Sequence, residues 1–216
     1  MRAIDAYLWV LTCRDDAEHG FRENGTIVGC VTCGGLPTQT GTRVTFSIDP
    51  NHLSTEIILR NRKNKFVLNL LDVRQYGLVQ HFGLQSGRHV DKFNAVTGDD
   101  SSTTNVPFTT LSKDKSDIRS LIMADTCAWL ECEILHVNPF DDRIILVVST
   151  SQTSFVKSDH LSQRLQLLHQ YLSTKQLPVD IKCPLSISAL YALDPNFDAR
   201  HKQSFAGHAN SLRLTE

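Results

Sequence analysis

The stretch HFGLQSGRHVDKF at residues 81–93 gathers basic side chains in a segment with the composition of a loop. Gly83 is placed to end a helix, and Arg88, His89 and Lys92 follow it. A loop that folds over an anion supplies charge-assisted hydrogen bonds from such side chains, and phosphate suits them well. The stretch is therefore a candidate anion site, with an ordinary solvated loop as the alternative interpretation.

A second candidate is the segment Asp49-Pro50-Asn51-His52-Leu53-Ser54-Thr55, which joins an alternating strand to a helix. The first amide N–H groups of a helix have no partner inside the helix, and with the helix dipole they attract phosphate. The hydroxyls of Ser54 and Thr55 would add two donors. The alternative is a helix start that is merely well capped.

Small residues cluster around the expected second strand. Asn24-Gly25-Thr26 enters this strand, with Asn-Gly as a turn signal, and Gly29-Cys30-Val31-Thr32-Cys33-Gly34-Gly35 leaves it. Where side chains are small or absent, a flat ligand can approach the main chain and bond to its amides. Glycines that serve a β-bulge and a hairpin turn would give the same pattern, so both interpretations stay open.

The six cysteines lie at positions 13, 30, 33, 127, 132 and 183. Most fall in apolar strand-like segments, where a thiol behaves as a small hydrophobic group, so we expect buried free thiols. Cys30-Val-Thr-Cys33 has the spacing of a zinc or redox pair, which is the lesser alternative. A structural zinc site needs a second ligand pair, and Cys127 and Cys132 lack that spacing, so no metal is predicted.

The overall composition limits the classes of partner. Hydrophobic residues make up 41% of the 216 and charged residues 21%, and the formal net charge of −1 provides no large basic field for nucleic acid. No apolar run approaches the roughly 20 residues that cross a bilayer. The N-terminal segment lacks a cleavage pattern and is interpreted as the first strand. We therefore expect a cytoplasmic protein without membrane or nucleic-acid partners.

Hydrophobic patterns predict a mainly β chain with α-helices. Six segments have strand character: 6–13, 26–33, 42–49, 65–71, 127–134 and 143–150. One helix follows Ser54. A second runs from Asp72 to about Phe82, with Asp72 and Gln75 as an acidic variant of the capping box. This order of elements predicts an antiparallel barrel with helices packed outside it.

Two further segments differ from the strands in composition and hydrophobic pattern. Residues 95–120 are rich in turn formers and predict a long surface excursion. Residues 158–173 carry leucines on one helical stripe and predict an amphipathic helix. We divide the chain into a barrel domain at 1–155 and a C-terminal helical extension at 156–216, packed on the barrel or on a partner subunit.

Several short motifs follow one another in an order that carries a resemblance. Asn-Gly opens the second strand, Asp-Pro-Asn ends the third, and Ser-Thr-Glu-Ile-Ile opens the first helix. FVLNLL at 66–71 comes next, followed by Phe-Gly at 82–83, Ser-Gly at 86–87 and Asp-Lys-Phe at 91–93; LECE at 130–133 looks like a later barrel strand. The ordered series resembles the flavin reductase-like domain of the FMN-binding split-barrel proteins, over roughly residues 5–150.

The resemblance implies a six-stranded antiparallel Greek-key split barrel with peripheral helices, which holds FMN near a homodimer interface. The ring side of the FMN site is expected at the second strand: Asn24, Gly25, Gly29, Cys30, Val31 and Thr32. The phosphate side is expected at the first helix and the basic loop: Asn51, His52, Ser54, Thr55, Arg88 and Lys92. Residues 36–42 depart from the Ser-x-x-Pro-Pro turn common in the family, which leaves the ring-side contacts open.

The implied activity is that of an NAD(P)H-dependent flavin reductase. A hydride from NADH or NADPH would reach the flavin N5, and electrons would pass to a flavin, a ferric complex or a protein acceptor. No catalytic side chain is assigned, and the chain has no glycine-rich dinucleotide fingerprint. Two alternatives remain: an FMN-carrying electron-transfer protein without direct NAD(P)H activity, and a non-catalytic split-barrel module for binding or assembly.

Overall fold

The computed structural model describes residues 6–15, 22–38, 41–60, 65–93, 121–155, 170–171, 173–174, 176, 183–194 and 196–197, with the backbone alone at 33–38, 41, 151–155 and 188. The expected excursion at 95–120 and most of the expected helix at 158–173 lie outside these residues. In the described part, no helix is long and apolar enough to cross a membrane.

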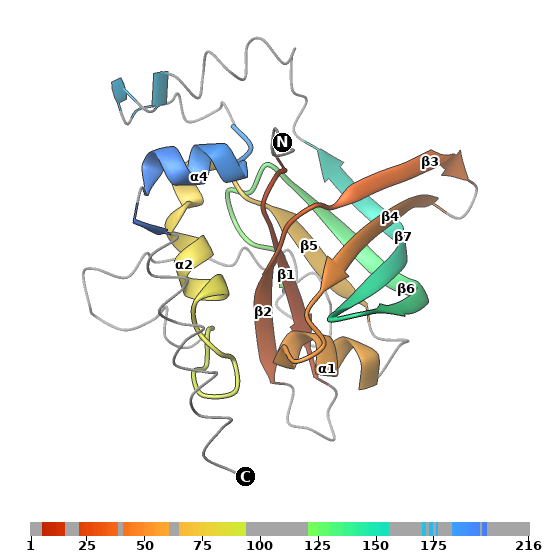
Figure 1. The fold of residues 1–216 in the computed structure, drawn as a ribbon. Coiled ribbons are helices and arrows are strands. Elements are labelled where there is room, and N and C mark those ends of the chain that lie inside the picture. Colours follow the sequence, from red (N-terminus) through yellow and green to blue (C-terminus); the bar gives the residue numbers. More distant parts are fainter. Residues whose placement is uncertain are drawn as a thin grey trace.

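One antiparallel sheet forms the body of the protein (Figure 1). Its strands are β1 (Trp9–Arg14), β2 (Glu23–Val28), β3 (Thr32–Thr38), β4 (Gly41–Ile48), β5 (Phe66–Leu70), β6 (Ala128–Phe140) and β7 (Arg143–Phe155). They lie in the order β2-β1-β5-β6-β7-β4-β3. Strands β5, β6 and β7 follow one another, and β4 returns to lie beside β7, which is a Greek key.

The sheet curls so that β2 and β4 approach each other without pairing. The alternation predicted within 42–49 is confirmed, because Val44, Phe46 and Ile48 point into the barrel and are at most 3% exposed. Alternate residues of β1 divide in the same way: Trp9 and Leu11 belong to the barrel core. The mainly β fold with a split barrel and peripheral helices is confirmed.

Helix α1 (Leu53–Arg60) closes one end of the barrel (Figure 1). Its residues Ile57 and Ile58 are 1% exposed and belong to the same core cluster as Phe46 and Phe66, whose rings meet edge to face. Burial of two isoleucines contributes about 3–6 kcal/mol relative to exposure. The start of α1 is thereby fixed between the ends of β2 and β4.

A second core lies outside the barrel, where helix α2 (Gly77–Gly83) and helix α4 (Ile187–Leu193) cover the outer face of β1. Val10 of β1, Leu78 of α2 and Leu190 of α4 all belong to this cluster. Residues 183–187 run between two barrel segments: Leu185 donates its N–H to Leu71 O at 2.8 Å and accepts from Leu8 N at 2.9 Å. The described part of the C-terminal extension is therefore packed on the barrel.

The predicted boundary at residue 155 stays a prediction, because 156–169 lie outside the described part of the chain. The cysteine interpretation is confirmed for Cys13, Cys127, Cys132 and Cys183, which are buried thiols outside any disulfide. Cys30 differs, because its free thiol is exposed.

Four local predictions need correction. The expected strand 26–33 is divided by a break at residues 29–31 into β2 and β3, so six expected segments form seven strands. The Asn24-Gly25 pair lies inside β2 rather than in a turn, because a Cβ on Gly25 would be 2.8 Å from the Phe82 ring. The glycine thus serves close packing and not a reversal of the chain.

The expected helix from Asp72 to Phe82 is also divided. A 3₁₀ turn, η2 (Val73–Gln75), carries the predicted capping box, and α2 follows after Tyr76. Gly83 is the last residue of α2 and not the residue beyond its end; Leu84 caps the helix. A Cβ on Gly83 would be 3.2 Å from Ile27, so this glycine lets α2 approach β2.

Asn69 of β5 is fully buried and connects three segments of the chain. Its Nδ2 donates to Thr12 Oγ1 at 3.0 Å, and its Oδ1 accepts from Met123 N at 3.0 Å. Thr12 Oγ1 donates in turn to Leu121 O at 2.8 Å. The asparagine in the FVLNLL motif therefore fixes the position of residues 121–123 beside β1 and β5.

We expect Asn69→Ala to lower the free energy of unfolding by about 2–3 kcal/mol, because buried polar groups of Thr12 and Met123 would lose partners. Urea denaturation followed by circular dichroism measures this change. Asn138→Ala, at an exposed position of β6, is the control and should change stability by less than about 0.5 kcal/mol. Equal small losses in both variants would show that the Asn69 network contributes little.

Candidate functional site

A pocket of about 340 Å³ opens where the ends of β2 and β4 meet. Its lining comprises Ile27, Gly29, Cys30, Ser47, Ile48, Asp49, His52 and Arg143. Three of the predicted site residues, Gly29, Cys30 and His52, are thus brought together. The volume lies at the lower end of the roughly 300–1,000 Å³ typical of small-molecule sites.

The break between β2 and β3 forms one wall of the pocket. A Cβ built on Gly29 meets nothing within 4 Å, so the main chain is directly open to the pocket at this point. Cys30 has a φ of 55°, a left-handed conformation that is uncommon for a residue other than glycine. The bare main chain at Gly29 gives a flat ligand a stretch of wall without a side chain, next to the exposed thiol of Cys30.

His52 faces this wall from the turn between β4 and α1. Its Nδ1 lies 3.1 Å from Thr26 Oγ1 of β2, which fixes the imidazole ring. Burial lowers the pKa of His52 below its ordinary value of 6.5, and the charges of Lys92 and Arg143 lower it further, against the opposing effect of Asp49. The imidazole is therefore uncharged at neutral pH.

The turn that carries His52 is held by its own side chains. Asp49 accepts at Oδ1 from Asn51 N at 2.8 Å, and Thr55 Oγ1 donates to Asp49 O at 2.6 Å. Ser54 Oγ accepts from Asn24 Nδ2 at 3.0 Å. Ser54 and Thr55 are both 1% exposed, so their hydroxyls position the turn instead of facing solvent.

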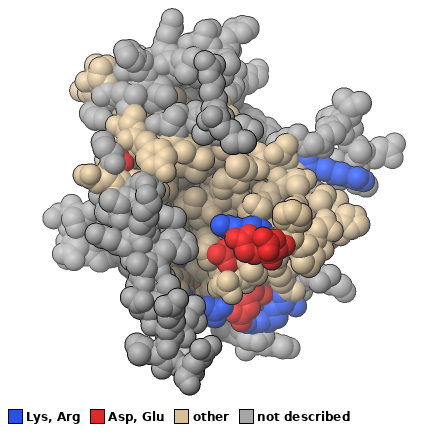
Figure 2. Space-filling view, viewed as in Figure 1, with Lys and Arg blue, Asp and Glu red and all other residues tan. Residues whose placement is uncertain are grey.

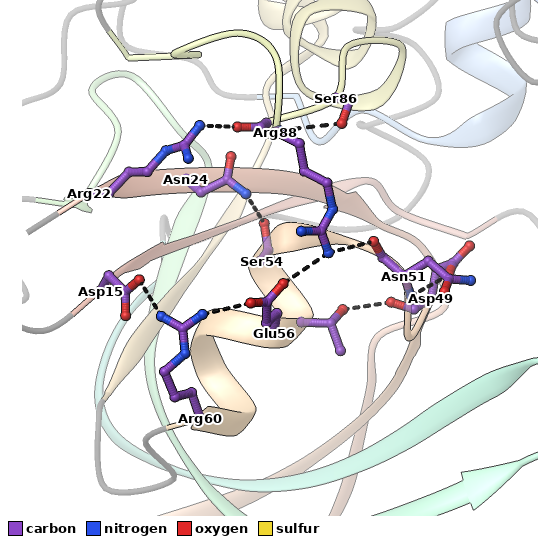
Figure 3. A network of polar contacts seen from close by, with 12 residues as sticks. Asp15, Arg22, Asn24, Asp49, Asn51, Ser54, Glu56, Arg60, Ser86 and Arg88 are labelled. Atoms are coloured by element: carbon purple, nitrogen blue, oxygen red, sulfur yellow. Dashed lines mark hydrogen bonds and ion pairs between the residues drawn. The ribbon is translucent and has the colours of Figure 1, made fainter. Parts of the chain in front are cut away.

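Arg88 reaches this turn from the loop that follows α2 (Figure 3). Its Nη2 donates to Glu56 Oε2 at 2.9 Å and approaches Asn51 O at 3.5 Å. The Arg88 side chain is 48% exposed. The basic loop thus approaches the first helix through Arg88, whose guanidinium lies beside Asn51, two residues before α1, and beside Glu56 of the helix.

The backbone of the same loop is fixed on β2. Arg22 donates to Gly87 O, and Gly87 packs directly on Asn24, where an added Cβ would come within 2.2 Å of Asn24 Oδ1. Because no side chain fits at residue 87, the glycine allows the loop to lie on the strand. Asn24 thus supports both the loop and, through Ser54, the start of α1.

Lys92 occupies a different place from the one expected. Its side chain is 3% exposed, and Nζ donates to Gly25 O and Phe82 O, each at 2.8 Å. The ammonium also lies 5.9 Å from the centroid of the Phe82 ring. Burial lowers the pKa of Lys92 to about 8. Lys92 therefore connects the loop to β2 and α2 through buried hydrogen bonds, and its ammonium does not extend into solvent.

The remaining predicted residues lie around the pocket without lining it. Val31 packs against the barrel core, and Thr32 is exposed at the beginning of β3. Sequence reasoning missed Arg143 and Asp49 as pocket residues and Glu56 as the partner of Arg88. Only Asp49 had a local signal, since it stands in the Asp-Pro-Asn turn; the position of Arg143 depends on the pairing of β7 with β4.

The depressed pKa of Lys92 predicts a pH-dependent contribution to stability. Between about pH 8 and 10.5 the unfolded chain binds a proton that the folded chain has released, so folding becomes more favourable as pH rises. Burial raises the pKa of the Cys13 thiol from 9.0 to about 12, which acts in the opposite direction. The effect of Lys92 must therefore be measured as a difference between two variants.

We expect the difference in free energy of unfolding, wild type minus Lys92→Met, to rise from pH 8 to pH 10 by up to about 1.4 kcal/mol per pH unit. Urea denaturation at several pH values measures it. The control is Lys65→Met, a second lysine-to-methionine change at a side chain that is 43% exposed, and the rise should be larger for Lys92→Met than for this control. A flat difference for Lys92→Met would contradict the buried position of the ammonium.

Comparisons with solved structures place this fold among flavin-binding proteins. The FMN-binding protein of Thermus thermophilus with bound 1-cyclohex-2-enone superposes with a TM-score of 0.54 at 20% identity, over 71% of this chain and 72% of that chain. The NADH:FAD oxidoreductase of Streptomyces globisporus C-1027, in complex with NAD and FAD fragments, has a TM-score of 0.53 at 16% identity, over 73% and 79%. These likenesses concern the fold.

The styrene monooxygenase flavin reductase of Pseudomonas putida S12 has a TM-score of 0.50 at 15% identity, over 71% of this chain and 82% of that chain. A sequence comparison with curated proteins found no match. Residues 1–171 match the family model of the flavin reductase like domain. Because this match spans most of the 216 residues, the chain belongs to the flavin reductase-like domain family.

Proposed function

We propose that this protein binds FMN at the split of the barrel and acts as an NAD(P)H-dependent flavin oxidoreductase. The observation that carries the proposal is the pocket where bare main chain at Gly29 faces His52, on a turn that also reaches Arg88. Within the family, this geometry supports a ring site and a phosphate site joined by residues 49–52.

The ring end fits a flat aromatic group. The open space at Gly29 and the exposed backbone at Cys30 allow a ring edge to approach the main-chain amides. Ile27 and Ile48 supply apolar lining, and Ser47, Asp49, His52 and Arg143 supply polar groups around it, of which the His52 imidazole has a lowered pKa because it is buried. Cofactor sites combine apolar lining with polar groups that fix the orientation of the ligand.

The phosphate end fits an anion. Arg88 lies beside Asn51, two residues before α1, where the helix dipole favours negative charge. Lys92 adds positive potential from below, weakened by its lowered pKa. Ser54 and Thr55 act through the turn that they hold, because their hydroxyls bind Asn24 and Asp49.

The chemistry of bound flavin is to accept a hydride and release electrons singly or in pairs. The protein contributes binding and orientation. Main-chain dipoles at residues 29–30 stabilise negative charge that develops at a ring edge, because they are fixed before the reaction. The contact of His52 Nδ1 with Thr26 Oγ1 fixes the orientation of the imidazole ring, and Arg143 contributes a cation to the lining of the pocket. The electron acceptor is not encoded in these residues.

A homodimer and a cytoplasmic location stay predictions. Leu135 and Phe140 of β6 are 42% and 67% exposed, which supports a contact surface on that strand. Size-exclusion chromatography with light scattering tests the dimer.

Anaerobic titration separates the proposed activity from its alternatives. The protein loaded with FMN should lose its flavin absorption band on addition of NADH or NADPH. Bleaching by dithionite but by neither nicotinamide would identify an electron carrier, a function supported by the likeness to a protein described only as FMN-binding. If the protein does not retain FMN, the remaining alternative, a non-catalytic split-barrel module for binding or assembly, would be favoured.

Gly29→Val tests the ring end directly. A Cβ at this position meets nothing within 4 Å and the backbone lies outside the left-handed region, so the fold should be retained while the valine side chain projects into the pocket. We expect FMN and riboflavin to bind at least about tenfold more weakly, or 1.4 kcal/mol, in fluorescence titrations.

The matched control for this variant is His136→Val, at an exposed position of β6 that does not line the pocket. Its flavin affinity and its melting temperature should equal those of the wild type. Normal flavin binding by Gly29→Val would show that the flavin ring does not bind at Gly29.

A further inference from the structure

Arginines and carboxylates form a connected network along α1, and Figure 2 shows acidic and basic side chains side by side in the lower part of the view, where Figure 1 places this helix. Glu56 binds two arginines at once, Arg60 at 2.6 Å through Oε1 and Arg88 at 2.9 Å through Oε2. Arg60 also binds Asp15 at 2.8 Å. The order of the network is therefore Asp15, Arg60, Glu56, Arg88 (Figure 3).

The two ends of this network differ in how firmly they are held. Asp15 is 9% exposed and lies at the end of β1, whereas the Arg88 and Glu56 side chains are 48% and 41% exposed. Exposed ion pairs contribute about 0–1 kcal/mol, so the contact between Arg88 and Glu56 breaks at little cost. Glu56 keeps Arg60 as its partner when this happens, and no carboxylate is left unpaired.

The base of Arg88 stays in place when its side chain moves. Gly87 is held by Arg22 and by close packing on Asn24, and Lys92 anchors the loop through Gly25 O and Phe82 O. None of these contacts involves the Arg88 guanidinium. The Arg88 side chain is thus exposed and weakly held, on a loop whose backbone is fixed beside the start of α1.

We propose that Glu56 is an internal competitor for Arg88, which the phosphate of a bound flavin must displace. This inference rests on the proposed function. Phosphate offers a guanidinium a bidentate partner of higher charge than a carboxylate, so the exchange favours a phosphorylated ligand. Glu56 thereby lowers the affinity for every anion and sets how much charge a ligand needs to engage Arg88.

A double-mutant cycle of Glu56→Gln and Arg88→Gln tests the exchange, with dissociation constants for FMN and riboflavin measured by flavin fluorescence and folding checked by circular dichroism. We expect Glu56→Gln to bind FMN about two- to fivefold more tightly and riboflavin unchanged, because only FMN carries the phosphate. Arg88→Gln should weaken FMN alone. In the Arg88→Gln background, Glu56→Gln should bring no gain.

Each other outcome is decisive. A gain that persists without Arg88 would show plain repulsion between Glu56 and the phosphate and would overturn the exchange. No gain from Glu56→Gln, or an equal gain for riboflavin, would also overturn it. Equal binding of FMN and riboflavin by the wild-type protein would overturn the exchange, because it would show that Arg88 makes no contact with the phosphate, while the proposed ring site would stand. Binding of neither flavin would refute the proposed function and the exchange with it.

Discussion

The buried ammonium of Lys92 is the interaction on which the candidate site depends. A charge in an apolar environment costs several kcal/mol unless polar groups surround it, and the carbonyls of Gly25 and Phe82 supply two such partners. These carbonyls belong to β2 and to α2, so the requirement to satisfy one ammonium brings a strand, a helix and a loop together. The position of Gly87 on Asn24, and of Arg88 beside α1, follows from that contact.

Helix α2 needs support of its own to supply its carbonyl, and the C-terminal segment gives it. Asp72 is fully buried ahead of η2 and accepts from Cys183 N at 2.8 Å, and Arg74 lies 2.6 Å from its Oδ1. Farther along, Gln80 of α2 donates to Asp194 at 2.6 Å. Residues 183–194 thus hold both ends of the α2 region, and a distant part of the chain contributes to the site without lining the pocket.

Local patterns in the sequence predict the elements well where one physical cause dominates. The period-two alternation of β4 follows from one buried face, and the capping box at Asp72 follows from side chains three residues apart. The site is less accessible to such reasoning. Lys92 has the appearance of a surface lysine, because nothing near it in sequence shows that carbonyls from residues 25 and 82 converge on its side chain.

The same limit explains the other differences. Gly25 and Gly83 have the sequence context of a turn and a helix end, yet both are required by packing, against Phe82 and Ile27 respectively. Arg143 enters the pocket only because β7 pairs with β4 in a register that places Ile144 opposite Ile48. Contacts between residues far apart in the chain have no signal in the local sequence. The ordered series of family motifs nevertheless identified the fold in which these contacts form.

The distribution of charge gives the two ends of the pocket different chemical character. His52 is neutral at neutral pH and Lys92 is partly neutral a little above it, because burial disfavours both cations. The full positive charge near the turn at 49–52 therefore comes from guanidinium groups, which stay charged over the working pH range of proteins. The positive charge of Arg88 at the α1 end favours an anionic tail, and the bare main chain at Gly29, beside Ile27 and Ile48, favours a flat ring. A mononucleotide with a flat base has this polarity, and one turn of the chain joins the two parts.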